Sequence, residues 1–70
     1  MQDDMNRGAQ ALNLWTRRDG MTRDEAAEAL GLKVYTLDSL RSGRRRPSLD
    51  VAVRIEDRTA GYVRVRDWVS

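Results

Sequence analysis

The sequence contains no cysteine and no histidine, and this absence excludes several kinds of site. Without cysteine the chain forms no disulfide, and without both residues it lacks the usual ligands of zinc. Histidine is the commonest catalytic base and cysteine a common nucleophile, and the serines here have no evident base close to them in the sequence. We therefore expect no metal, no cofactor and no enzymatic activity.

The chain is also short and has no long apolar run. The longest apolar runs are a few residues, and the N-terminal MQDDMNRG has neither the basic nor the apolar region of a signal peptide. We expect a cytoplasmic protein that does not contact a membrane. A chain of this length buries only about 60% of its unfolded surface, which allows one small core and no deep pocket. Residues 1–70 are therefore expected to form a single domain without a small-molecule site.

Positive charge is concentrated in one segment of the chain. The net charge of the whole sequence is only +2, but residues 33–47 hold Lys33 and four arginines against Asp38, which leaves +4. Residues 21–32 carry −2, and the other segments are neutral. The general excess of arginine over lysine does not explain this clustering. A local concentration of positive charge is expected of a protein that binds a polyanion such as nucleic acid.

The spacing of apolar residues predicts an all-α chain. Apolar residues recur at steps of three and four, which is the period of an amphipathic helix. We predict helices over about residues 4–18, 23–30 and 34–42, and a fourth helix that begins after Ser48. The first helix is expected to bury a stripe formed by Met5, Gly8, Ala11, Leu12 and Trp15.

Capping residues and glycines mark the ends of these helices. Thr22 and Glu25 stand at the spacing of a capping box, so the second helix is expected to begin at residue 23. Gly31 supplies the positive φ of a sharp turn, and Gly43 ends the third helix. Ser48 is expected to be the N-cap of the fourth helix.

The fourth helix is predicted to end at Thr59-Ala60-Gly61, with an inward face of Leu49, Ala52, Val53 and Ile55. The segment that follows, GYVRVRDWV, fits two structures. Its valines alternate with arginines as in a strand, whereas residues 65–68 also fit one helical turn. We favour the turn, because a lone strand has no partner within the chain.

Residues 23–42 have the pattern of a helix-turn-helix. Ala27 is small where the two helices would cross, and Gly31 allows the bend between them. The angle between the helices would be filled by Leu30, Leu37 and Leu40. The predicted fold is a compact four- to five-helix bundle that contains this unit.

A longer pattern, TL..L.SGRR.PSL..A..IE..T.G.V over residues 36–63, resembles the Cro and CI-type family of small phage and bacterial transcriptional regulators. The resemblance covers about residues 8–68. It implies a lambda-repressor-like bundle whose third helix enters the major groove of double-stranded DNA. It also implies a repressor that occupies an inverted-repeat operator as a homodimer.

The resemblance implies two groups of DNA contacts. The residues that would face bases are Val34, Tyr35, Asp38 and Ser39. The residues that would lie near phosphates are Lys33, Arg44, Arg45 and Arg46. Thr22 and Arg23 are also expected near phosphates, because the N-terminus of a helix attracts anions.

Several of these residues have a second interpretation. Val34 stands where the family commonly has glutamine, so its base contact would be with a thymine methyl group. Asp38 either accepts a hydrogen bond from a cytosine amino group or pairs with Arg41, one turn further along the helix. Tyr35 either contacts DNA or covers the helix surface. Thr22 either contributes to phosphate binding or only caps its helix.

The C-terminal segment is the expected contact between two copies of the chain. One monomer reads few bases and its core is thin, so we expect a homodimer joined by Tyr62, Val63, Val65, Trp68 and Val69. Trp68, like Trp15, is interpreted as a core or subunit contact rather than a platform for base stacking. The alternative function is a protein-interaction module with the same fold, such as an antitoxin or a small phage adaptor. The basic segment favours DNA binding over this alternative.

Overall fold

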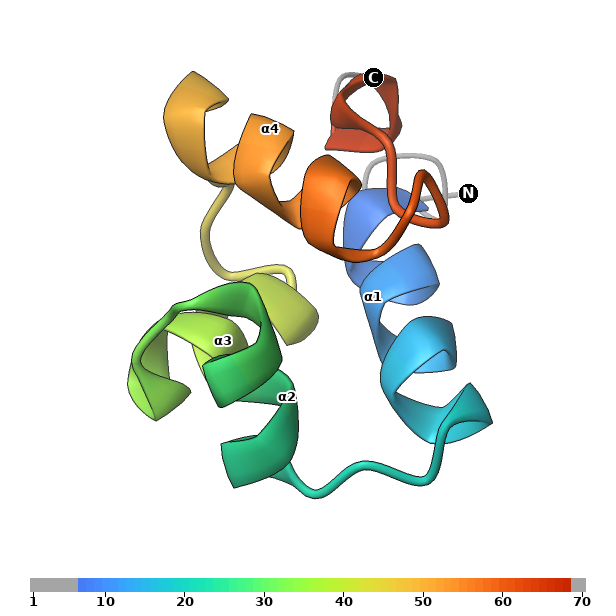
Figure 1. Ribbon diagram of the computed structural model, residues 1–70. Coiled ribbons are helices and arrows are strands. Elements are labelled where there is room, and N and C mark those ends of the chain that lie inside the picture. The colour runs from blue at the N-terminus through green and yellow to red at the C-terminus, as the bar shows by residue number, and fades with distance from the viewer. Residues whose placement is uncertain (1–6, 69–70) are drawn as a thin grey trace.

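The computed structural model describes residues 7–68, and every regular element within them is helical (Figure 1). The elements in chain order are α1 (Arg7–Arg18), α2 (Arg23–Leu30), α3 (Val34–Arg41), α4 (Leu49–Arg58) and the short 3-10 helix η2 (Val65–Trp68). No strand is present in this part of the chain, so the all-α fold class is confirmed. The second helix has the predicted bounds, and the third ends one residue earlier than predicted. Residues 4–6 of the first predicted helix lie outside the described residues.

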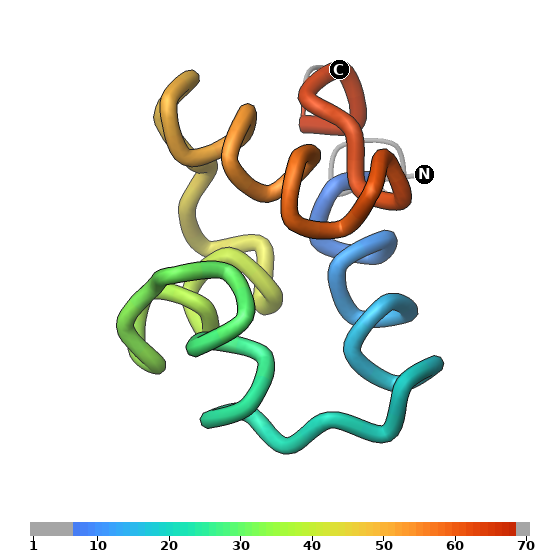
Figure 2. Tube along the Cα trace, viewed as in Figure 1, coloured from blue at the N-terminus to red at the C-terminus, as the bar shows by residue number. Residues whose placement is uncertain are grey.

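The helices pack around one small core. Figure 1 shows α2 and α3 on one side of the molecule, α1 on the other side, and α4 between them at one end. The Cα trace in Figure 2 shows the C-terminal segment running back to the first turn of α1, where Trp68 lies against Gly8. The largest fully buried side chains come from all four α-helices and from the C-terminal segment: Leu12, Leu30, Leu37, Leu40, Ile55 and Val63.

Local capping interactions fix the ends of the helices, as predicted. The backbone N–H of Glu25 donates to Thr22 Oγ1 at 3.1 Å, and the N–H of Thr22 donates to Glu25 Oε1 at 2.9 Å, which completes the capping box of α2. Gly31 ends α2 in the left-handed conformation, with φ of 71°. Ser48 caps α4, because its hydroxyl accepts from the N–H of Val51 at 3.3 Å.

The C-terminal segment forms the helical turn that we favoured over a strand. The side chains of Glu56 in α4 and of Thr59, the C-cap residue of α4, hold its backbone. The N–H of Val63 donates to Thr59 Oγ1 at 3.1 Å, and the N–H of Val65 donates to Glu56 Oε1 at 3.3 Å. The segment thus obtains backbone hydrogen bonds without pairing with a second strand.

The predicted inward face of α4 is wrong at two positions. Ala52 and Ile55 are buried, but Leu49 and Val53 are 70% and 51% exposed. At about 100° per residue, Leu49 and Val53 lie roughly 120° and 160° around the helix from Ile55. The polar Thr59, which is buried instead, lies only about 40° from Ile55, and its hydroxyl donates to the Ile55 carbonyl at 2.8 Å.

Candidate nucleic-acid interface

Helix α3 is anchored by one face and exposed on the other. Leu37 and Leu40 are buried in the core, whereas the side chain of Tyr35 is 64% exposed. Ser39 is half-buried, and so is Val34, which packs partly against the core. Tyr35 therefore offers the largest free surface on α3, and Val34 offers only the part of its side chain that the core leaves uncovered.

The start of α3 carries positive charge but no side-chain cap. Lys33 occupies the N-cap position, and its side chain makes no capping hydrogen bond. A lysine side chain has no acceptor atom, so it cannot take a hydrogen bond from the first turn of the helix. Lys33 is exposed, which leaves its ammonium group accessible at the end of α3.

Asp38 pairs with Arg23 from α2, not with Arg41. An Arg23 Nη1 atom lies 3.4 Å from Asp38 Oδ2, and the two side chains are 62% and 38% exposed. Arg41 is turned toward α1 instead, where its Nε donates to Asn13 Oδ1 at 2.6 Å. Asn13 in turn donates from Nδ2 to the Arg41 carbonyl at 3.1 Å. Both the oxygen and the nitrogen of the Asn13 side-chain amide are therefore hydrogen-bonded to Arg41. The predicted Asp38–Arg41 pair is therefore replaced by a link between α2 and α3.

The arginine loop is tied to the end of α3 by its backbone. The N–H groups of Arg44 and Arg45 both donate to the Ser39 carbonyl, at 3.1 and 3.3 Å. The N–H of Arg44 also lies 3.4 Å from Ser42 Oγ, which accepts from it. Arg44, Arg45 and Arg46 are all exposed. Three exposed arginines thus follow α3 in a loop whose backbone is hydrogen-bonded to the end of that helix.

Two arginines of α4 have a different position, which sequence reasoning missed. Arg54 Nη1 donates to the Gly31 carbonyl at 3.0 Å, and Arg58 Nη1 donates to the Ala29 carbonyl at 2.9 Å. Both carbonyls belong to the last turn of α2 or the residue that follows it, where carbonyl groups lack partners within the helix. The spacing of four residues between the two arginines was the available signal, since it places both on one side of α4.

Thr22 acts as a cap, and the capping box accounts for its hydroxyl and its N–H. The phosphate contact at Thr22 stays a prediction. Arg23 follows at the first position of α2 and is directed toward α3 by Asp38. The residues predicted to contact phosphates thus lie at the start of α2 (Thr22 and Arg23), at the start of α3 (Lys33) and in the loop after α3 (Arg44, Arg45 and Arg46).

The C-terminal residues assigned to a subunit contact are largely used within the chain. Val63 and Trp68 are buried, with exposed fractions of 0% and 8%, and Val65 is half-buried. Tyr62 is 39% exposed, and the Arg18 guanidinium lies 5.0 Å from the centre of its ring. Val69 lies outside the described residues. Dimerisation through this segment stays a prediction.

The described residues show neither a metal site nor a membrane-spanning helix. Within residues 7–68, no three acidic side chains are placed to hold a metal ion together. None of the helices in the same range has the length and apolar character that a membrane crossing requires.

An exposed helix held across a glycine-containing turn, beside a fixed loop of arginines, defines a helix-turn-helix protein. Comparison with protein families agrees, because residues 16–59, more than half of the chain, match the helix-turn-helix family model. The chain belongs to this family, of the Cro and CI type. Neither curated proteins nor solved structures give a match. The family consists of regulators that bind double-stranded DNA and is not generally enzymatic, so this protein is a DNA-binding transcription regulator in that general sense.

Proposed function

We propose that this regulator is a sequence-specific repressor that occupies its operator with α3 in the major groove. The observation that carries the proposal is that α3 is buried on one side and exposed on the other. Leu37 and Leu40 fix the helix to the core, while Tyr35 on the outer side is 64% exposed. A major groove about 12 Å wide admits one α-helix, and an anchored helix can present its outer side chains to base edges in a fixed register.

The base contacts proposed for α3 differ in chemistry. Tyr35 and Ser39 have hydroxyl groups that both donate and accept hydrogen bonds, and Val34 supplies a methyl surface for thymine. Asp38 would accept from the amino group of cytosine. Arg23, 3.4 Å from Asp38 in the free protein, offsets the repulsion between that carboxylate and DNA phosphates.

The proposed phosphate contacts form a frame around these base contacts. Lys33 lies at the start of α3 and the arginine loop at its end, while Thr22 and Arg23 lie at the start of α2. Each phosphate neutralised by such a residue should contribute about −0.9 to the slope of log affinity against log salt concentration. We expect binding to fall steeply between low and moderate salt, on specific and random duplexes alike.

The proposal includes a homodimer, with the whole chain acting as one DNA-binding domain. A single α3 contacts only a few base pairs, so an operator read by two copies gives greater discrimination. Two-fold symmetry would then require an inverted repeat with half-site centres about 34 Å apart, one turn of the duplex.

The experiment compares variants on the preferred duplex, found by selection from random sequences, and on random duplex. Tyr35→Ala and Ser39→Ala are expected to weaken the preferred site by about 1 to 3 kcal/mol while leaving non-specific binding nearly unchanged. Arg45→Ala is expected to weaken both duplexes nearly equally and to reduce the salt slope by about one. Arg64→Ala is the matched control, because Arg64 precedes η2, which packs against α1 and α4.

Leu37→Ala controls for folding. Loss of this buried leucine should cost about 2 to 5 kcal/mol of folding stability and abolish both kinds of binding together. Folding of every variant is followed by circular dichroism. If folded Tyr35→Ala and Ser39→Ala variants keep full sequence preference, α3 is not the element that reads the bases.

A further inference from the structure

Helix α3 begins without a side-chain cap, although its direction decides which base edges its side chains can reach. Lys33 occupies the N-cap position and makes no capping hydrogen bond. The buried Leu37 and Leu40 attach α3 to the core only further along the helix. The placement of the start of α3 therefore depends on the turn that leads into it from α2, residues 31–33.

This turn satisfies only part of the end of α2 with its own backbone. The N–H of Gly31 donates to the Glu28 carbonyl at 3.1 Å, and the N–H of Leu32 donates to the Ala27 carbonyl at 2.9 Å. These two hydrogen bonds close the last turn of α2 at a left-handed glycine. Two further carbonyl groups, those of Ala29 and Gly31, are bonded from outside the helix-turn-helix.

The donors to these two carbonyls are arginines four residues apart, on one side of α4. Arg54 Nη1 donates to the Gly31 oxygen at 3.0 Å, and Arg58 Nη1 donates to the Ala29 oxygen at 2.9 Å. A hydrogen bond from an ionised donor is stronger than one between neutral groups. The positive charge is also favourable at the C-terminal end of α2, where the helix dipole is negative. The two arginines thus fix both the last turn of α2 and the first residue of the turn that follows.

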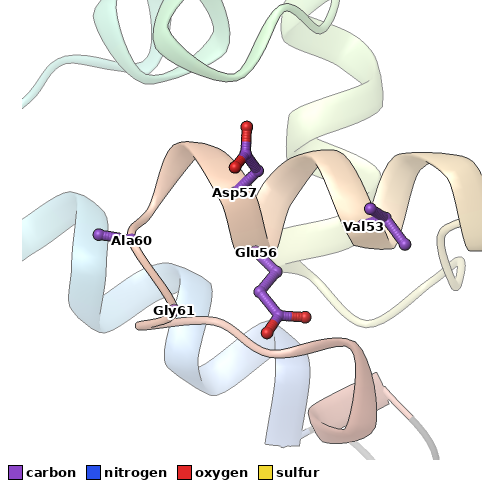
Figure 3. A pocket seen from close by; sticks show the side chains of 5 residues that line it. All are labelled: Val53, Glu56, Asp57, Ala60 and Gly61. Atoms are coloured by element: carbon purple, nitrogen blue, oxygen red, sulfur yellow. The ribbon is translucent and has the colours of Figure 1, made fainter.

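Helix α4 is itself held on its opposite side. At about 100° per residue, Glu56 lies roughly 160° around the helix from Arg54 and from Arg58. In Figure 3 the side chain of Glu56 points toward the C-terminal segment, where the N–H of Val65 donates to Glu56 Oε1 at 3.3 Å. The arginines therefore connect the turn before α3 to a helix that is bonded to the rest of the chain.

We propose that Arg54 and Arg58 are positioning residues for base recognition. They hold the turn in the geometry that directs α3, and so they set how well the protein distinguishes its operator from other sequences. The inference rests on the proposed function, because it names residues on which the reading of bases by α3 depends. A hydrogen bond to a base edge needs a donor–acceptor distance of about 2.7 to 3.2 Å, so a small tilt of α3 is enough to lose one.

Contacts with phosphates tolerate such a tilt. The side chains of Lys33 and of the arginine loop are long and exposed, so they can follow a phosphate when α3 shifts slightly. Loss of Arg54 or Arg58 should therefore weaken the preferred duplex far more than random duplex. An arginine that itself contacts a phosphate behaves differently, because its loss weakens all duplexes and reduces the salt slope by about one.

The first test measures the ratio of affinities for the preferred duplex and random duplex. Arg54→Ala and Arg58→Ala are each expected to lower this ratio by about 10-fold, comparable to the loss of one base contact, with the salt slope unchanged. Arg54→Lys and Arg58→Lys keep a charged donor and should recover most of the ratio. Arg17→Ala, which removes an exposed arginine from α1, is the matched control and should leave the ratio unchanged. An unfolded fraction lowers both affinities equally, so reduced stability alone does not change the ratio.

The second test asks whether Arg58 acts through the base contacts of α3. Two double-mutant cycles on the preferred duplex combine Arg58→Ala with Tyr35→Ala and with Ser39→Ala. In at least one cycle the double variant should lose less affinity than the product of the two single fold-changes, because a contact that a tilt of α3 has already broken cannot be lost twice.

Three outcomes overturn the inference while leaving the proposed function intact, provided that Tyr35→Ala or Ser39→Ala lowers the sequence preference. They are an unchanged affinity ratio in both Arg54→Ala and Arg58→Ala, equal weakening of both duplexes with a smaller salt slope, and additive losses in both cycles. If folded Tyr35→Ala and Ser39→Ala variants keep full sequence preference, the proposed function has failed and the inference fails with it.

Discussion

Gly8→Ala is expected to destabilise this protein, although the same change in an exposed helix interior stabilises by about 1 kcal/mol. The reason is the approach of Trp68, whose indole ring lies against Gly8 so closely that a Cβ atom would overlap three of its carbon atoms. Trp68 is only 8% exposed, and it closes one end of the core between α1 and α4.

The magnitude follows from the two opposed effects. Forcing an extra methyl group into a packed contact costs about 1 to 3 kcal/mol. If the indole moves outward instead, part of its burial is lost, and full burial of a large apolar side chain is worth about 1.5 to 3 kcal/mol. The gain in helix propensity is at most about 1 kcal/mol and is smaller near the start of α1, where Gly8 lies. We expect a net loss of about 1 to 2 kcal/mol.

Thermal unfolding followed by circular dichroism measures this loss. In a domain of this size each kcal/mol lowers Tm by about 4 to 8 °C, so the expected decrease is about 4 to 16 °C. The control is the same change in a Trp68→Leu background, where the smaller side chain leaves room for the methyl group. Gly8→Ala should be neutral or stabilising there. An unchanged or raised Tm in the parent chain, or an equal decrease in both backgrounds, would refute the packing argument.

Two further changes test the ends of α2. Thr22→Ala removes the capping box and should cost about 1 kcal/mol of stability, whereas Thr22→Asp keeps a good N-cap and should preserve Tm. If Thr22 lies near a phosphate, Thr22→Asp should nevertheless weaken DNA binding. Equal DNA affinity of the parent and Thr22→Asp would show that Thr22 does not contact a phosphate. Gly31→Ala should cost about 1 to 2 kcal/mol of folding stability, because the native φ of 71° is strained for alanine. Space is not the cause, since the atom nearest to the new Cβ, Arg54 Nη1, lies at an ordinary 3.4 Å. Urea unfolding measures the lost stability, and an unchanged unfolding midpoint would contradict the prediction.

The helices could be predicted because their boundaries depend on neighbours in the sequence. Thr22 and Glu25 are three residues apart, and Gly31 acts through its own backbone, so the limits of α2 followed from local chemistry alone. The helical turn at residues 65–68 was predicted for a different reason, because the chain offered no second strand with which this segment could pair.

The parts that were mispredicted depend on contacts between distant segments. Apolar character identified Leu49 and Val53 as core residues, but the core is filled from α1 and the C-terminal segment, and the buried side of α4 is the one that carries Ile55. Asp38 was expected to pair within its helix, yet Asn13, 28 residues before Arg41, engages that arginine. No local pattern marks such a partner.

The hydrogen bonds from Arg54 and Arg58 to the end of α2 link α4 directly to the helix-turn-helix. In the proposed dimer, these links would help to hold each reading helix in a fixed orientation relative to the rest of its own chain. Each base pair inserted between half-sites moves the second one by 3.4 Å and turns it by about 34 to 36° around the duplex. A stiff dimer cannot follow that rotation, so operator choice would depend on spacer length as sharply as on the bases themselves.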